Sequence, residues 1–306
     1  MNNGIRTLWV VILMLLSCVA VKAAHDFEVD GICYNKIWGD SVTVGVTRKS
    51  YGYEGHVTIP DKVTYNGDTY SVTSICEKAF YYCSGLTGVT IPNSITSIGN
   101  EAFHQCAALK HLVIEDRTEV LRFGRRAFLA CPLDSVYIGG EIEFGGNDNS
   151  PFYWQSSLRT VVIGDKVKTI PDKEFYSCSR LRSIVIGNGV TSVGEDAFYS
   201  CDWLGKIVCY AVEPPYCAYR ALEGINKRAC SLTVPEGSKT AYQEAFQWCE
   251  FFNIQGTDVT GIETVLPDDE LENAPVYNLQ GVQMKEQKEH LPTGIYIQGG
   301  KKIFIR

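Results

Sequence analysis

One phrase of alternating apolar and polar residues recurs along the middle of the chain. It contains a Phe and, in five of six copies, a Cys three residues later. Successive Phe residues are 23, 25, 24, 23 and 23 positions apart. Self-similarity at such a period is typical of repeat proteins, in which each unit forms one coil of a solenoid. The phrases are centred on Phe80, Phe103, Phe128, Phe152, Phe175 and Phe198.

A short run of mostly β-branched residues follows each phrase. Alternation with a period of two predicts a strand, and turn residues such as Pro92 and Asn93 come after it. Because one unit cannot bury its own apolar face, we expect the units to stack with their strands parallel on one face. The runs are Val89–Ile91, Leu112–Ile114, Val136–Ile138, Val161–Ile163, Ile184–Ile186 and Ile207–Cys209.

Five of the 12 cysteines occupy one equivalent position in the repeat. Stacking would place them in a column, and the small, mostly apolar Cys side chain suits a narrow buried site. We therefore expect buried thiols, although adjacent coils could also bring two Cα atoms within disulfide range. Gln155 interrupts the column in the fourth unit. The five are Cys83, Cys106, Cys131, Cys178 and Cys201.

Residues 98–109 read Ile-Gly-Asn-Glu-Ala-Phe-His-Gln-Cys-Ala-Ala-Leu. This segment resembles the phrase of the BspA-type leucine-rich-repeat family of bacterial surface proteins, and the resemblance extends over about residues 27–256. It implies a leucine-rich-repeat solenoid with short parallel β-strands and turns or 3-10 pieces between them. It also implies adhesion or recognition without a fixed ligand. The third and fourth units depart most from the family phrase.

Both ends of the repeats, at 76–211, are expected to be capped, because an open end exposes core and unpaired strand edges. Residues 24–75 are predicted to form an N-terminal β cap built on a hairpin. Residues 212–256 are predicted to form a C-terminal cap, with a strand at Leu232–Pro235 and a helix near Ala241–Phe251. The spacing of Thr240 and Gln243 predicts a capping box at the start of that helix.

The final segment, residues 257–306, has a different pattern. Its alternating runs resemble the C-terminal sorting domain of the type IX secretion system of Bacteroidetes. The resemblance implies a small β tail domain that the export machinery reads, and a source in that phylum. The runs are Val276–Val282, Leu291–Ile297 and Gly300–Arg306.

The first 23 residues have the features of a signal peptide. Arg6 precedes nine apolar residues, Leu8–Leu16, and small residues precede a cut after Ala23. Nine residues are too few for a transmembrane span, which needs about 20. The alternative is a lipid anchor at Cys18, because the residues before it resemble a lipoprotein box. Both alternatives predict a secreted or outer-membrane surface protein without a transmembrane span.

Charge and motifs narrow the function. The net charge is −7, and an acidic chain lacks the positive surface that nucleic acid requires. No catalytic, cofactor or metal motif stands out, so we expect no enzyme, no cofactor and no metal. The Gly-Asp-Ser segment at 39–41 fits a hairpin turn better than a nucleophile motif. His104, Cys106 and His111 are close in sequence, but we expect them to point in different directions.

The middle residue of each strand run is expected to point outward, because its two neighbours point inward. These residues form either an ordinary sheet surface or an exposed apolar stripe that docks a partner. For the stripe, the expected partner-binding residues are Tyr137, Val162 and Val185, with Arg159 and Arg182 beside them. The full set of middle residues is Thr90, Val113, Tyr137, Val162, Val185 and Val208.

A competing site is the group of aromatic residues near each Phe, which either bind a partner or only cover the edge of the solenoid. The sequence thus predicts a non-catalytic surface or secreted protein that recognises a host protein or glycan. The alternative is a structural surface-layer component that associates with itself, and the sequence leaves the oligomeric state open. The aromatic residues are Tyr81, Tyr82, Tyr153, Trp154, Tyr176, Tyr199 and Trp203.

Overall fold

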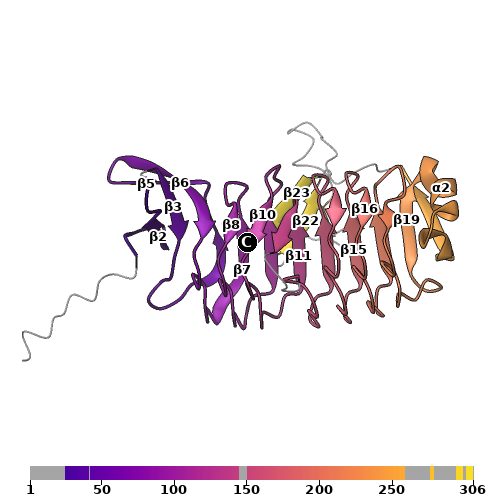
Figure 1. The fold of residues 1–306 in the computed structure, drawn as a ribbon, viewed down its shortest axis with the longest axis horizontal. Coiled ribbons are helices and arrows are strands. Elements are labelled where there is room, and N and C mark those ends of the chain that lie inside the picture. Colours follow the sequence, from indigo (N-terminus) through magenta and orange to yellow (C-terminus); the bar gives the residue numbers. More distant parts are fainter. Residues whose placement is uncertain are drawn as a thin grey trace, which may run out of the picture.

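The protein is a solenoid of strands and turns with little helix (Figure 1). The structure, a computed structural model, describes residues 25–40, 42–144 and 150–258, and the backbone of 276–278, 294–298 and 301–305. Coils are stacked along the long axis, with the N-terminal strands at one end and helix α2 at the other (Figure 1). The predicted repeat solenoid is therefore confirmed.

One long sheet contains the repeated strand runs. Its nine strands have the order β20-β19-β17-β15-β13-β11-β9-β7-β4, and each pair is parallel. Val136 lies opposite Leu112 on one side and Val161 on the other, so the register is that of the repeat. The predicted row of parallel strands is confirmed. The strands are β4 (Glu54–Thr58), β7 (Gly85–Ile91), β9 (His111–Ile114), β11 (Ser135–Ile138), β13 (Thr160–Ile163), β15 (Ser183–Ile186), β17 (Lys206–Cys209), β19 (Ser231–Pro235) and β20 (Asn253–Thr257).

Shorter strands build another side of the coils in two separate sheets. The first has eight strands in the order β1-β2-β3-β6-β8-β10-β12, with β5 paired to β6, and the second is β14-β16-β18. At the break between them, the Glu141 carboxylate accepts hydrogen bonds from the backbone N–H groups of Lys168 and Thr169. The strands are β1 (Phe27–Val29), β2 (Ile32–Lys36), β3 (Thr43–Val46), β5 (Lys62–Tyr65), β6 (Asp68–Ile75), β8 (Ser97–Ile98), β10 (Leu121–Phe123), β12 (Ile142–Phe144), β14 (Thr169–Ile170), β16 (Ser192–Val193) and β18 (Tyr216–Cys217).

The six repeated Phe rings form a stacked column inside the solenoid. Each is at most 1% exposed. The centroids of Phe80, Phe103 and Phe128 are 4.6 and 4.7 Å apart in sequence order. The next step, from Phe128 to Phe152, widens to 6.3 Å. Stacked aromatic rings at such spacing add to the burial energy of each ring, so the column is tightest in the first three coils.

The five repeated cysteines are also buried, which confirms the predicted column. The Cys106 thiol donates a hydrogen bond to the Phe80 carbonyl at 2.9 Å, and the Cys178 thiol donates to the Phe152 carbonyl at 3.2 Å. A thiol at this position therefore joins its coil to the preceding one. That the five stay reduced remains a prediction.

The turn that carries each Phe–Cys pair contains residues with left-handed backbone. Lys78 and Tyr82 have φ values of 57° and 59°, and equivalent residues recur in the other coils. Their N–H groups donate to the carbonyls of Asn100 and His104 in the next coil, at 3.0 and 2.9 Å. These turns thus form a hydrogen-bonded edge along the solenoid, which we call the rim.

The rim is interrupted between the third and fourth coils. Within the described residues, no backbone hydrogen bond joins residues 126–130 to residues 150–154. The Gln155 side chain instead donates to the carbonyls of Phe128 and Pro151, at the long distances of 3.4 and 3.5 Å. The wider spacing of the Phe rings occurs at the same step.

Before the repeats, β1 and β2 form an antiparallel hairpin, and β3 extends it.

After the repeats, β19 matches the strand predicted at Leu232–Pro235. The helical segment is broken into η1 (Glu236–Ser238), α2 (Lys239–Glu244) and η2 (Trp248–Glu250). The predicted capping box is wrong, because α2 follows directly from η1 and begins at Lys239 without a side-chain cap. Thr240 therefore lies inside the helix.

The C-terminal strands β21 (Val276–Asn278), β22 (Gly294–Gln298) and β23 (Lys301–Ile305) form an antiparallel sheet of their own.

The predicted signal peptide, Cys18 and Ser41 lie outside the described residues. No helix in the described part of the chain has the length and apolar character to cross a membrane. The predicted domain boundaries stay predictions.

Candidate binding surfaces of the solenoid

The first candidate surface is the outward face of the nine-stranded sheet. The expectation that its middle residues are exposed is wrong for Tyr137 and Val162, each 1% exposed, and for Thr90, which is 7% exposed. The other three, Val113, Val185 and Val208, are partly exposed. Tyr137 and Val162 form an apolar cluster separate from the main core, with partly buried Val113, Val185 and Tyr210 packed against them. A side chain that points away from the core is therefore not necessarily exposed to solvent, because other residues can cover the outward face of the sheet.

The two arginines predicted to belong to this site do not join the buried cluster. The Tyr137 hydroxyl donates to the Asp116 carboxylate. Arg159 is exposed and forms an ion pair with Asp134 at 3.1 Å. Arg182 is also exposed, and its guanidinium lies 6.0 Å from the centre of the Trp203 ring. The structure therefore brings Tyr137, Val162 and Val185 together but leaves the two arginines outside their cluster.

The second candidate surface is the rim, where three tyrosines stack in register. The centroids of Tyr153 and Tyr176 are 5.0 Å apart, and those of Tyr176 and Tyr199 are 5.1 Å apart, with nearly parallel planes. Each tyrosine follows a buried Phe, so the spacing of the coils sets the spacing of the rings. We call Tyr153, Tyr176 and Tyr199 the aromatic ladder.

A cation closes one end of the ladder. The Arg220 guanidinium lies 4.8 Å from the Tyr199 centroid and 5.0 Å from the Tyr219 centroid. It is held there by Asp196, whose buried carboxylate it meets at 2.9 Å. The hydrogen bond to Asp196 raises the pKa of Arg220 above its ordinary value, so the guanidinium stays charged. This arrangement fixes a planar cation over an aromatic face.

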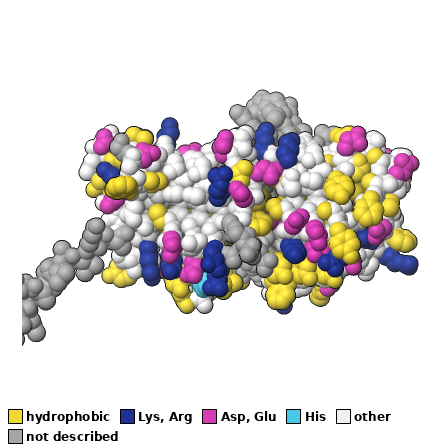
Figure 2. Space-filling model, in the orientation of Figure 1, with side chains coloured by type: hydrophobic (Ala, Val, Ile, Leu, Met, Phe, Trp, Pro, Cys, Tyr) yellow, Lys and Arg dark blue, Asp and Glu magenta, His cyan; other side chains and the backbone are white. Residues whose placement is uncertain are grey.

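Two exposed Trp side chains accompany the ladder. Trp154 and Trp203 are each 65% exposed. Trp154 stacks on Tyr153 with a centroid distance of 5.7 Å, and its backbone is left-handed, with φ of 59°. The backbone N–H of Trp154 donates to the Tyr176 carbonyl at 2.9 Å. Figure 2 shows apolar side chains gathered along the lower edge of the solenoid.

A smaller aromatic group lies on the rim nearer the N-terminus. Tyr81 stacks on His104 at 5.3 Å and contacts Tyr82 edge-on at 4.6 Å. Leu129 occupies the equivalent position in the next coil. The rim therefore has two aromatic segments, separated where the hydrogen-bonded edge is interrupted.

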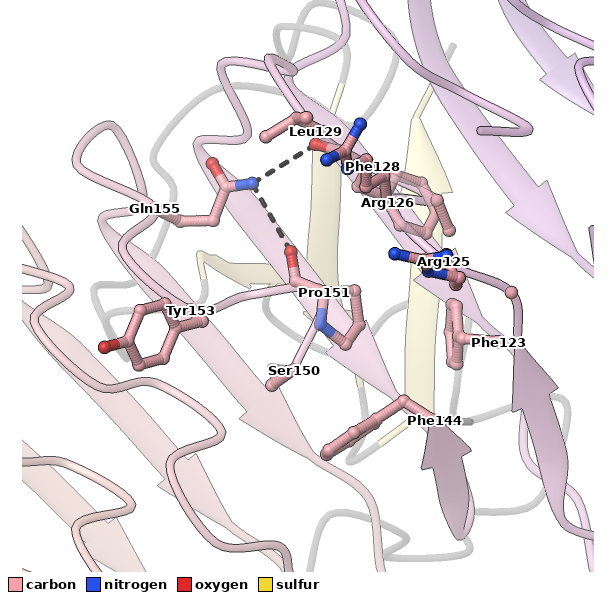
Figure 3. Close-up of a pocket in the computed structure, with 12 residues that line it drawn as sticks. Phe123, Arg125, Arg126, Phe128, Leu129, Phe144, Ser150, Pro151, Tyr153 and Gln155 are labelled. Carbon is pink, nitrogen blue, oxygen red and sulfur yellow. Dashed lines mark hydrogen bonds between the residues drawn. The ribbon is translucent and has the colours of Figure 1, made fainter. Parts of the chain in front are cut away.

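That interruption opens a hollow of about 240 Å³ (Figure 3). Phe123 and Phe144 lie at one side of it and Tyr153 and Gln155 at another (Figure 3). Arg125 and Arg126 also line it, and both are exposed. The hollow thus joins the first ring of the aromatic ladder to a positively charged patch.

Two of the column thiols, Cys106 and Cys178, are poorly suited to act as nucleophiles. The side-chain hydrogen bond between Cys106 and Cys131 raises the pKa of Cys106 to about 12, and burial adds to the rise. Burial raises the pKa of Cys178 to about 12 as well. A thiol that stays protonated is a poor nucleophile and a poor metal ligand.

The three residues weighed as metal ligands are each engaged separately. His104 stacks on Tyr81, Cys106 donates to a carbonyl, and His111 Nδ1 lies 2.9 Å from the Ser135 hydroxyl. Burial lowers the pKa of His111. They form no common site.

Among the described residues, potential ligand atoms of His25, Glu28 and Cys33 do lie within 4.8 Å of one another, at the N-terminal hairpin. Sequence reasoning did not single out this cluster. The ammonium group of Lys49 lies 3.0 Å from Glu28 Oε1 and lowers the pKa of that carboxyl. It already supplies the positive charge that a metal would bring.

Sequence reasoning also missed Arg220 and Tyr219. They belong to a seventh, degenerate copy of the phrase in which Leu222 stands where the other copies have Phe. Leu222 follows Phe198 by 24 positions, and Phe198 N–H donates to the carbonyl of the adjacent Ala221 at 2.9 Å. The constant interval was the signal that could have found this copy.

The fold and the rim together define a leucine-rich-repeat protein with an exposed aromatic edge. The sequence profile of the BspA type leucine rich repeat region matches six copies within residues 73–205 and 147–264, more than half of the chain. The chain therefore belongs to the BspA-type leucine-rich-repeat family.

Several solved structures are similar to this chain. A leucine-rich-repeat protein from Bacteroides capillosus is 29% identical over 45% of this chain and 96% of its own, with a TM-score of 0.36. A leucine-rich-repeat protein of T. pallidum is 23% identical over 60% and 70%, with a TM-score of 0.35. A leucine-rich cell surface protein from Faecalibacterium prausnitzii is 21% identical over 70% and 71%, with a TM-score of 0.39. A comparison with curated proteins found no match.

Proposed function

We propose that this chain is a non-catalytic binding or adhesion protein that holds a partner along its rim. The aromatic ladder with its exposed Trp neighbours is the observation that carries the proposal. Tyr, Trp and Arg dominate the energy of protein interfaces; Tyr and Trp do so because they bury large areas at low entropic cost. The rim supplies all three types on a hydrogen-bonded backbone, so little ordering is required when a partner binds.

The chemistry of the ladder favours a protein over a glycan as the partner. Sugars pack against free aromatic faces, whereas the faces of Tyr176 are occupied by Tyr153 and Tyr199. What the ladder offers outward is ring edges and hydroxyl groups, together with Trp154 and Trp203. Such a mixture of apolar area and hydrogen-bonding groups suits a protein surface. A host protein is the partner that we favour, and a host glycan is the alternative.

The surface location of the chain is part of the same proposal. A signal peptide ending at Ala23 would export it, with lipidation at Cys18 as the alternative anchor. The sequence of the C-terminal segment supports type IX export and a source in Bacteroidetes. Tyr137, Val162 and Val185, first considered as the binding site, are not included in the rim, but Arg182 is, because it lies against Trp203.

The test is binding of the full chain to arrays of purified extracellular proteins and of glycans. The double variant Trp154→Ala, Trp203→Ala should weaken capture of a protein partner by about 30-fold or more, the effect of losing an interface hot spot. Ala is compatible with the backbone at 154, because Ala130 has the same φ of 59° in the preceding coil. Tyr216→Ala is the matched control, since Tyr216 is 71% exposed on β18.

Unchanged affinity in the double variant would refute the rim as the binding site. If the chain binds only glycans, the rim remains the proposed site only if the double variant abolishes glycan binding. Self-association is the second candidate function, which the long rows of repeated side chains would suit. Light scattering of the chain at increasing concentration distinguishes the two, because a binding module stays monomeric while a surface-layer component assembles.

A further inference from the structure

The middle of the nine-stranded sheet is buried on both of its faces. All four residues of β11 and all four of β13 are buried. Val136 and Val161 face the core, whereas Tyr137 and Val162 point the other way. A tyrosine and a valine on an open sheet face would remain largely exposed to water. The outward face of β11 and β13 is therefore covered.

The cover is local. The outward residues Val113 on β9, Val185 on β15 and Val208 on β17 are only partly buried. Burial is thus complete over two strands and only partial on β9, β15 and β17; Thr90 on β7 is buried separately, beside His56. Strands lie about 4.8 Å apart, so the fully covered strip and its margins are roughly 15 Å wide, the width of a three-stranded sheet.

We infer that the C-terminal strands β21–β23 pack face to face on the outward side of β11 and β13. They form a sheet of three strands with its own antiparallel register. Figure 1 places β22 and β23, in yellow, at the middle of the solenoid beside the labels of β10 and β11, and the faint yellow strands pass behind the same region in Figure 3. Stacked sheets pack about 10 Å apart through their side chains.

The sequence of these strands is suited to such a contact. Apolar residues occupy alternating positions, as in Ile295 and Ile297 of β22 and Ile303 and Ile305 of β23. A sheet with this composition requires a surface on which to bury one face, because three short strands alone are marginally stable. The cluster around Tyr137 and Val162 provides that surface.

The chain is long enough to reach this position. β20 ends at Thr257, four strands away from β13 in the sheet order. Four spacings amount to about 19 Å. The 18 residues between Thr257 and Val276 can span up to roughly 60 Å when extended. The connection therefore permits the packing without strain.

This inference goes beyond binding at the rim and does not depend on it. It assigns the two candidate surfaces of the solenoid to different partners. The strand face is occupied by the C-terminal segment of the same chain, and the rim stays open. Removal of that segment would uncover Tyr137 and Val162 as a second apolar surface.

The test is hydroxyl-radical footprinting of the full chain, with a protease site inserted within residues 259–275. Before cleavage, Tyr137 should be as protected from oxidation as Tyr34, a core residue. After cleavage, removal of the C-terminal fragment in denaturant and refolding of the solenoid, the oxidation of Tyr137 should approach that of Tyr82, which is 57% exposed. Oxidation of Tyr137 at the level of Tyr82 in the uncut chain would overturn the inference. So would protection that survives removal of the fragment, as it would if a second copy covered the face.

A charged residue placed under the cover gives an independent check. In the Val162→Asp variant, a buried carboxylate should loosen the contact, and the nicked fragment should elute separately from the solenoid. The fragment should remain bound in the wild-type chain and in the control variant Val208→Asp, whose site on β17 lies at the margin. Equal retention in Val162→Asp and Val208→Asp would contradict the assignment, and if Val162→Asp fails to fold, the footprint of the wild-type chain decides.

Discussion

The first three coils and the fourth coil of this solenoid are built from the same phrase. They differ in how tightly the Phe rings stack and in which hydrogen bonds join neighbouring coils. In the first three, the Phe rings lie 4.6–4.7 Å apart and backbone hydrogen bonds join every pair of adjacent rim turns. In the fourth, the ring spacing from the preceding coil is 6.3 Å and Gln155 replaces the column thiol. The comparison teaches that the repeat tolerates loss of its polar contacts as long as the aromatic column stays buried.

The irregular coil also introduces features that stability does not require. It opens the hollow beside Arg125 and Arg126, and it begins the aromatic ladder at Tyr153. Glu174 replaces the Ala of the phrase in the next coil and is 1% exposed. Regular coils thus provide the stability of the solenoid, whereas departures from the phrase provide the distinctive surface.

The largest expected effect is on the Phe column. Phe103→Ala should lower the free energy of unfolding by about 4 kcal/mol, because it leaves a cavity between two closely stacked rings. Phe152→Ala should cost less, about 3 kcal/mol, because its neighbouring rings are 6.3 and 5.7 Å away and already packed less tightly. Denaturant unfolding measures both values. A larger loss of unfolding free energy for Phe152→Ala than for Phe103→Ala would contradict the claim that the fourth coil is packed less tightly.

The next effect concerns the buried carboxyl of Glu174, in the coil that follows the irregular one. Burial raises the pKa of Glu174 from 4.5 to about 8, with Ser150 acting in the opposite direction. The folded state therefore retains a proton that the unfolded state releases, so the stability from this group is full below pH 4.5 and lost as the pH rises through about 8. We expect Glu174→Gln to match wild type at pH 4.5 and to be more stable by roughly 2–4 kcal/mol at pH 8.5.

Thermal and denaturant unfolding across this pH range checks the Glu174 prediction. Glu195→Gln serves as a control, because Glu195 is exposed in the equivalent turn of the next coil. Parallel pH profiles for Glu174→Gln and wild type would show that Glu174 is ionised in the folded protein.

A smaller difference is expected at the thiol position. Cys106→Ala removes a 2.9 Å hydrogen bond to the Phe80 carbonyl, and it should cost about 1–2 kcal/mol together with a small cavity. Gln155→Ala removes only two long contacts and should cost less than about 0.5 kcal/mol. Equal losses would mean that Gln155 fully replaces the column thiol.

The smallest change is expected in thiol chemistry. Cys249 is exposed and should react with a maleimide, whereas the five column cysteines should react only after unfolding. Their thiols are buried, and the pKa of Cys201 is held well above its ordinary value by desolvation. Mass spectrometry of unreduced protein should find no disulfide among the five, and a bond between any two would contradict the prediction.

The sequence predicted the parts of this molecule that repetition determines. The Phe and Cys columns, the strand register and the aromatic character of the rim follow from a constant interval and alternation. Burial of Tyr137 was not predictable, because the repeat determines only the direction of a side chain and not what lies over it. The ladder geometry with Arg220 was missed because Leu222 replaces Phe. The helix start at Lys239 was missed because a 3-10 turn precedes it.

The central claim is that the rim is the surface on which a partner binds. Photo-crosslinking of the full chain tests it most directly, with benzoylphenylalanine introduced at Ser177, which occupies the position of Trp154 one coil further along. The same label at Tyr216 on β18 is the comparison. The account predicts a covalent adduct with the captured protein from position 177 and none from position 216. An adduct from position 216 alone would contradict it.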